Sequence, residues 1–314
     1  MILRVTQGML TNNSVKYLSQ SYNKLAQLSD QMTTGKKILK PSDDPVIAMN
    51  GMRYRSETVE IEQFKRNLNE GFNWMENADS ALNETGSVLQ RIRELTVKAS
   101  NDSNTPSELK NISDEIGSLQ KHLITLAGTK VGDTYIFSGT DTDMKPINEN
   151  LIDIEFDTFA SQSNKEGYVI SYQGQTFKYD GDADAFLSST NGNERMTIDA
   201  SDKIAYGYRE ALEHRNGEEE TFTKIIGPEK LVISHEDAVS KNAEDVEIEV
   251  MKGVKLAINI RPQNAYSMDL FSGLQSTQRM LNDPETSGAE ITKSLDSIDR
   301  MLNGVLSTRS ELGA

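Results

Sequence analysis

The sequence contains no cysteine, which excludes disulfide bonds, thiol catalysis and metal sites built on cysteine ligands. Aromatic residues are scarce at 6%, and only 36% of the 314 residues are hydrophobic, against 26% charged. This composition is typical of an elongated protein with a large surface rather than of a compact enzyme. Long apolar runs are also missing. No segment approaches the ~20 residues of a membrane span, and the N-terminus lacks the apolar stretch of a cleaved signal peptide.

Positive charge is in deficit. A total of 33 Lys and Arg against 48 Asp and Glu gives a net charge of -15, and the isoelectric point is near 4.8. Phosphate backbones and anionic membrane surfaces repel such a chain, so we expect neither a nucleic-acid nor a membrane partner. Export by a route that uses no cleavable signal stays open.

The sequence does have strong helical periodicity. Residues 3–34 place apolar side chains at a seven-residue interval, which is the pattern of a narrow coiled-coil seam. The members of this seam are Leu18, Leu25, Leu28 and Met32. Many Asn, Ser and Gln residues lower the intrinsic helicity of the segment, so we expect this helix to need a partner that covers the seam.

Three further segments carry apolar stripes. Residues 45–100 form one uninterrupted pattern, and a helix of ~55 residues would extend ~80 Å. The next helix begins with a capping box of Thr105 and Glu108, with Pro106 at its first position. Together with the C-terminal stripe, these segments predict a rod-domain core of Ile61, Leu68, Met75, Leu82, Leu89, Leu109, Ile112, Ile116, Leu119, Leu123, Ile291, Leu295, Ile298, Leu302 and Val305.

The middle of the chain has a different character, with many Gly, Asp, Ser and Asn residues and short alternating apolar runs. The stretches "YVISYQGQTFKYDGD" and "VEIEVMKGVKLAINI" predict β-hairpins, and "SDKIAYGYREALEHR" predicts one short helix. In the second hairpin we expect Val254, Leu256, Ile258 and Ile260 to share one face.

The predicted fold class is therefore α+β: a long antiparallel helical rod or bundle formed by the N- and C-terminal segments, with an inserted β-rich outer domain. We divide the chain into a conditional helix and linker at 1–44, a first rod part at 45–139, the β-rich domain at 140–262 and a second rod part at 263–314.

The stretch "QMTTGKKILKPSDDPVIA" separates the first two helices. Gly35 is suited to end a helix, and Asp44 followed by Pro45 is suited to begin one. With Pro41 and Asp43 these residues form the predicted helix joint. A phosphate-binding loop would need a glycine at position 30 and Ser or Thr at position 37, where this chain has aspartate and lysine, so we exclude a nucleotide site.

Other candidate sites fail for similar reasons. Adjacent Asp43 and Asp44 point to different sides of any regular element, which argues against an acid–base pair. The run "DGDADA" has the first spacings of a calcium loop but lacks its later glycine and glutamate, so an acidic turn is the better interpretation. The histidines, His122, His214 and His235, show no metal spacing. We predict no catalytic, cofactor-binding or metal-binding residues.

The chain resembles the hook-associated proteins of the flagellin superfamily, and among them the hook–filament junction proteins. The resemblance rests on "TTGKKILKPSDDP" after an N-terminal heptad, then a long helix and "GTKVGDTYIFSGTDTD", and more loosely on "DLFSGLQ" and "STRSELGA". Flagellins share this arrangement but usually have alanines where this chain has Pro41 and Pro45, so the prolines favour the junction proteins.

The resemblance implies a structural subunit that is exported to the extracellular flagellum. Its implied partners are copies of itself, the preceding hook-associated protein, flagellin and an export chaperone, with no cofactor. Family members continue past the "LGA" motif with another helix, so we expect this chain to be truncated there. A flagellin-type filament subunit is the main alternative, and a glycan-binding or cell-wall-acting domain on a helical stalk is a further one. A general coiled-coil scaffold would explain the heptads but not "DTYIFSGT".

Overall fold

The computed structural model describes residues 7–101, 103–189, 194–199, 204–209 and 222–313. The chain divides into two units, Met1–Arg66 and Asn67–Ala314. In the first unit, helix α1 (Gln7–Thr34) is followed by a linker and by the beginning of helix α2 (Pro45–Ala99). The remainder of α2 belongs to the second unit.

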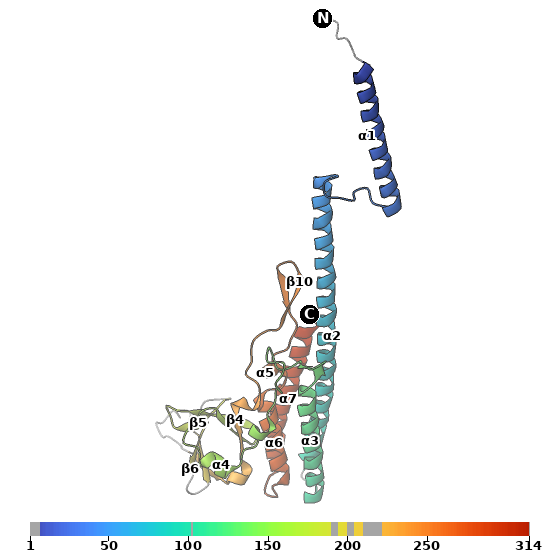
Figure 1. The fold of residues 1–314 in the computed structure, drawn as a ribbon. Coiled ribbons are helices and arrows are strands. Elements are labelled where there is room, and N and C mark those ends of the chain that lie inside the picture. The colour runs from blue at the N-terminus through green and yellow to red at the C-terminus, as the bar shows by residue number, and fades with distance from the viewer. Residues whose placement is uncertain (1–6, 102, 190–193, 200–203, 210–221, 314) are drawn as a thin grey trace, which may run out of the picture. The chain divides into compact units, whose positions relative to one another are not determined.

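The second unit contains an antiparallel helical bundle (Figure 1). Its helices are the second half of α2, α3 (Pro106–Ala127), α6 (Met268–Asn282) and α7 (Gly288–Leu312), with the short α5 (Pro262–Ala265) beside α7. Arg91 of α2 contacts Glu115 of α3 at 2.8 Å, and two turns earlier on α2, Glu84 contacts His122 at 3.2 Å. Because the residue numbers run in opposite directions along the two helices, α2 and α3 are antiparallel.

The same reasoning orients α7. The Arg93–Asp299 pair (2.6 Å) and the Asp79–Arg309 pair (2.7 Å) again run in opposite directions along α2 and α7. These pairs lie on the surface and contribute little stability singly. The bundle is held by its apolar core, which includes Leu82, Leu89, Ile116, Leu123, Phe271, Leu274 and Ile298.

Tyr266 is buried completely in this core, in edge-to-face contact with Phe137. Its hydroxyl lies 2.8 Å from the hydroxyl of Thr85. The Thr85 hydroxyl donates to the carbonyl of Ala81, so Tyr266 must donate to Thr85. Burial raises the pKa of Tyr266 above its usual range, which keeps the phenol in the neutral form that can donate.

The β-rich part lies between α3 and α5 in the sequence and beside α6 in Figure 1. The described strands of its sheet are ordered β8-β7-β6-β5-β4-β3-β9, with every neighbouring pair antiparallel. The bounds are β3 Tyr168–Tyr172, β4 Gln175–Asp180, β5 Ala185–Ser188, β6 Glu194–Asp199, β7 Ile204–Arg209, β8 Phe222–Ile226 and β9 Val232–His235.

Short elements complete this region. They are β1 Lys130–Val131, β2 Thr134–Tyr135, η1 Glu149–Leu151, α4 Phe156–Ala160, η2 Pro228–Lys230, η3 Glu236–Ala238, β10 Glu247–Met251 and β11 Val254–Ala257. The fold is thus α+β, with an inserted β-rich region between helical segments, and this sequence prediction is confirmed.

Both predicted hairpins are present, as β3–β4 and β10–β11. The predicted short helix is wrong for residues 204–209, which form β7, and residues 201–203 and 210–215 of that stretch lie outside the described residues. Ladder pairing with β6 on one side and β8 on the other outweighs the local helical preference of this segment. The expected common face does not extend over all four residues, because β11 ends at Ala257. Val254 and Leu256 lie in the strand and are exposed, whereas Ile258 and Ile260 lie beyond it and are buried.

We predict that Thr85→Val destabilises the bundle more than Tyr266→Phe. The valine leaves the buried Tyr266 hydroxyl without an acceptor, which costs about 1–3 kcal/mol. The phenylalanine leaves Thr85 bonded to the Ala81 carbonyl, so its effect is smaller. Urea unfolding followed by circular dichroism measures both, with the exposed Ser87→Ala as control. An equal loss for the two variants would contradict the assigned direction of the hydrogen bond.

Candidate assembly surface

The apolar face of α1 is exposed, and no described residue of its own unit covers it. The predicted seam residues Leu18, Leu25, Leu28 and Met32 expose 58%, 65%, 57% and 86% of their surface. Leu10, Val15 and Tyr22, also exposed, fall on the same side of a helix at 100° per residue. These residues form a continuous apolar face on α1, and a face of this kind marks an interaction site.

Helix α2 carries a similar stripe. Ile61, Leu68, Met75, Leu82 and Leu89 are spaced seven apart, but only the last two are fully buried and Met75 is half-buried. The prediction that Ile61 and Leu68 belong to the rod core is wrong, since they expose 64% and 36%. The reason is that the buried part of α2 begins only at Gly71, and no described helix covers the residues before it.

Sequence reasoning missed the upstream part of this stripe. Ile47 and Tyr54 lie fourteen and seven residues before Ile61, and they are exposed by 50% and 58%. Extending the heptad count back to Pro45 would have found both. We call the exposed apolar residues of α1 and of α2 before Gly71 the assembly surface.

The other predicted core residues lie in the bundle. Ile112, Ile116, Leu123, Ile291, Ile298 and Val305 are buried. Leu109, Leu119 and Leu302 are partly buried against that core, and Leu295 is half-buried.

The joint between the two helices is built from backbone-binding side chains. Gly35 follows the last residue of α1 with φ +66°, a left-handed conformation in which a side chain would be strained. Lys40 to Asp43 form a turn in which the Asp43 N–H donates to the Lys40 carbonyl at 3.0 Å, with Pro41 at the second position that suits its fixed φ.

The two aspartates of the joint bind different parts of the backbone. Asp43 accepts the N–H groups of Lys40 (3.0 Å) and Leu39 (3.1 Å), and these bonds lower its pKa. Asp44 accepts the N–H groups of Val46 and Ile47, both at 3.1 Å, which caps α2 directly before Pro45. Both carboxylates are therefore engaged with the backbone, and the geometry is that of a joint rather than of an acid–base pair.

The remaining candidate sites have structural roles. The Tyr179 hydroxyl donates to Asp184 at 2.7 Å and closes the acidic turn, and this bond raises the pKa of Tyr179. His122 pairs with Glu84 on the surface, His235 lies 3.4 Å from Asp237, and His214 lies outside the described residues. Within the described part of the chain, no three His, Asp or Glu side chains gather as a metal site.

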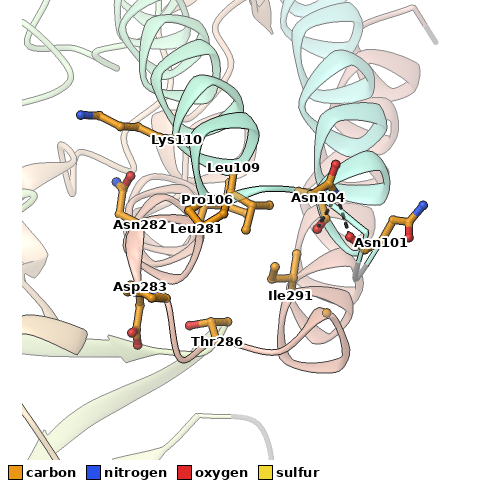
Figure 2. Close-up of a pocket in the computed structure, with 13 residues that line it drawn as sticks. Asn101, Asn104, Pro106, Leu109, Lys110, Leu281, Asn282, Asp283, Thr286 and Ile291 are labelled. Carbon is orange, nitrogen blue, oxygen red and sulfur yellow. Dashed lines mark hydrogen bonds between the residues drawn. The ribbon is translucent and has the colours of Figure 1, made fainter.

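A cavity of about 400 Å³ lies at the bundle end, where the α2–α3 and α6–α7 loops meet (Figure 2). Leu109, Leu281 and Ile291 supply its apolar lining. The side chain of Asn104 donates to the Lys98 carbonyl in the last turn of α2 at 2.7 Å and to the Asn101 carbonyl of its own loop at 2.8 Å. The polar groups shape the loops, and the arrangement does not resemble a reaction centre.

Comparison with known proteins shows similarity to flagellins. The family model of the bacterial flagellin N-terminal helical region matches residues 5–142. A flagellin of Clostridium tyrobutyricum is 23% identical over 325 residues, which cover 99% of this chain and 84% of that protein. The phase 1 flagellin of Salmonella naestved is 35% identical over 109 residues, 35% of this chain but 21% of that flagellin.

The fold has a counterpart among solved structures. The structure of a putative flagellar hook-associated protein from Vibrio parahaemolyticus matches with a TM-score of 0.55 and 15% identity, covering 87% of this chain and 88% of that one. The N-terminal part of the chain is therefore similar to the flagellin N-terminal helical region, and the chain shares its fold with that hook-associated protein. No described helix is long and apolar enough to cross a membrane.

We predict that Asp44→Ala weakens the start of α2. Loss of the cap costs about 1 kcal/mol, which corresponds to roughly fivefold faster amide exchange at Val46 and Ile47. Hydrogen exchange read by NMR measures this, and Asp44→Asn is the control because asparagine keeps an acceptor oxygen. Unchanged exchange in the alanine variant would show that Pro45 alone fixes the helix start.

Proposed function

We propose that this chain is a structural subunit of the bacterial flagellum that joins the hook to the filament, as a junction protein of the hook-associated protein 3 type. The observation that supports this most is the assembly surface, because its apolar residues are stabilised only when another helix covers them. The prolines at positions 41 and 45 and the hook-associated fold favour the junction over the filament.

In this proposal, copies of the chain assemble into a short tube. The preceding hook-associated protein lies on the hook side and flagellin on the filament side, and an export chaperone binds the subunit before secretion. The four-part division of the chain, with 1–44 as the axial segment and 140–262 as the outer domain, belongs to the same proposal. The net charge of -15 opposes premature aggregation of the monomer.

A flagellin-type filament subunit is the second candidate, because a protein named flagellin aligns with 99% of this chain. The two candidates differ in nucleation. A filament subunit extends short seeds of its own polymer into long filaments, whereas a junction subunit adds a limited layer to hooks that carry the preceding hook-associated protein. Electron microscopy of the purified chain with and without such hooks separates them, and long filaments from the chain alone would overturn the junction proposal.

The seam of α1 gives a test by substitution. We predict that Leu18→Asp with Leu25→Asp abolishes addition to hooks, because two carboxylates in the seam would be buried without partners. The matched control is Gln20→Asp with Gln27→Asp, which adds the same charge at the same spacing on the opposite face of α1. Sedimentation and microscopy measure assembly, and equal assembly by both variants would show that the seam is not the contact.

We further predict a change in protection on assembly. In dilute monomer the amides of α1 exchange rapidly, because its apolar face is uncovered and an isolated helix of this composition is marginal. In assembled junctions the same amides become protected. Hydrogen exchange with mass spectrometry measures both states, with the α3 amides as the internal control. Strong protection of α1 in the dilute monomer would contradict the proposal that assembly covers the seam.

A further inference from the structure

The sheet and the helical bundle have separate cores. Residues 153–235, here called the sheet domain, contain their own apolar cluster around Phe159, Ile170, Phe177 and Phe186. No residue of this cluster belongs to the bundle core. A domain with its own core can keep its fold while its orientation changes, provided that the contacts outside the core can open.

The described contacts between the sheet domain and α6 include a cluster of polar bonds centred on Arg279. Its guanidinium lies 2.6 Å from a carboxylate oxygen of Asp153 and also donates to the carbonyl of Leu231. Gln275, one turn earlier on α6, donates to the same Asp153 at 2.9 Å. These bonds connect α6 with the two ends of the sheet domain.

Lys230 makes the second polar connection. From η2 its ammonium reaches the α6–α7 loop, 2.8 Å from Asp283 and 3.3 Å from Glu285. The hydrogen bond to Asp283 raises the pKa of Lys230, and although burial acts in the opposite direction, Lys230 lowers the pKa of Asp283. At the β3–β4 turn, Gln173 donates to Glu290 of α7 at 2.7 Å.

Two cavities lie next to the bonds of Arg279 and Lys230. A cavity of about 830 Å³ lies between the β3–β4 turn, η2 and the α6–α7 loop, and one of about 480 Å³ lies on the α4 side of Arg279. Both are large compared with the space of a single water molecule, so water can reach the polar connections from two sides.

The covalent connections are close together. The segments that enter and leave the sheet domain run side by side, because Ile147 pairs with Val239 and the N–H of Asn148 donates to the Ala238 carbonyl at 2.8 Å. Because both connecting segments lie together at Ile147 and Val239, the sheet domain can rotate about them once the bonds of Arg279 and Lys230 are broken.

We propose that Arg279 and Lys230 form an electrostatic latch between the bundle and the sheet domain. When the latch opens, the sheet domain rotates on the paired segments near Ile147 and Val239 while both cores stay folded. The latch thus sets the angle at which this domain projects from the rod, and a neighbouring subunit or a change in ionic strength can shift it.

The test uses spin labels at Asn111→Cys on α3 and Asp182→Cys in the sheet domain, which are unique sites because the chain has no cysteine. Pulsed electron paramagnetic resonance gives the distribution of the distance between them in the full chain. We expect Arg279→Met with Lys230→Met to widen the distribution about twofold, since methionine keeps an apolar stem but loses the charge. Arg93→Met is the matched control, because it breaks an ion pair between α2 and α7 and leaves the sheet domain untouched.

A second measurement keeps the native latch residues. Raising the salt to about 1 M shortens the screening length to ~3 Å and should widen the distribution in the same way, with an unchanged circular dichroism spectrum. A narrow distribution in a folded double variant would overturn the latch. If the double variant does not fold, the salt series decides, and either a narrow distribution in high salt or loss of the sheet signal together with widening would overturn it.

Discussion

The apolar heptad stripe of α2 extends further toward the N-terminus than the described helices that cover it. The division of the molecule into a folded bundle and an exposed apolar surface depends on this difference in length. From Leu82 onward the stripe is buried between α3 and α7, and the bundle gains its stability there. Before Gly71 the same residue types at the same spacing face solvent. An apolar stripe stabilises a helix only when the stripe is buried. The upstream half of α2 is therefore suited to bind a partner that covers its stripe.

The joint at residues 35–45 lets α1 and α2 be oriented separately. A rigid connection would force α1 and α2 to share one helical axis, whereas Gly35, the Pro41 turn and the Asp44 cap end one helix and begin another independently. Each helix can then present its own apolar face to whatever covers it. The two aspartates, which as a sequence pair invite a catalytic interpretation, are both occupied by backbone N–H groups.

Much of this could be predicted from the sequence, because helix signals are local. The capping box at Thr105 and Glu108 and the stripe along α3 depend on residues three and four apart, and both are present in the structure. The predicted helix at β7 failed because strand pairing with β6 and β8 joins segments whose partners cannot be recognised from local sequence. The prediction that Ile61 lies in the rod-domain core failed for another reason. Periodicity shows which face of a helix is apolar, but it does not show where along the helix the cover ends.

The two kinds of surface that remain outside the cores suggest two kinds of mechanical role. Apolar faces such as those of α1 and upstream α2 gain stability from permanent burial, and they therefore favour a fixed tube of packed helices. The sheet domain also packs on α6 through β3, β4 and β9, and at the edges of this contact Arg279, Lys230 and their carboxylate partners join it to the bundle beside open cavities. Polar contacts of this kind exchange with water, and this exchange is the basis of the proposed latch. Both properties fit the proposed role as a junction, which would combine a stiff assembly of packed helices with a domain that adapts to neighbours of unlike geometry.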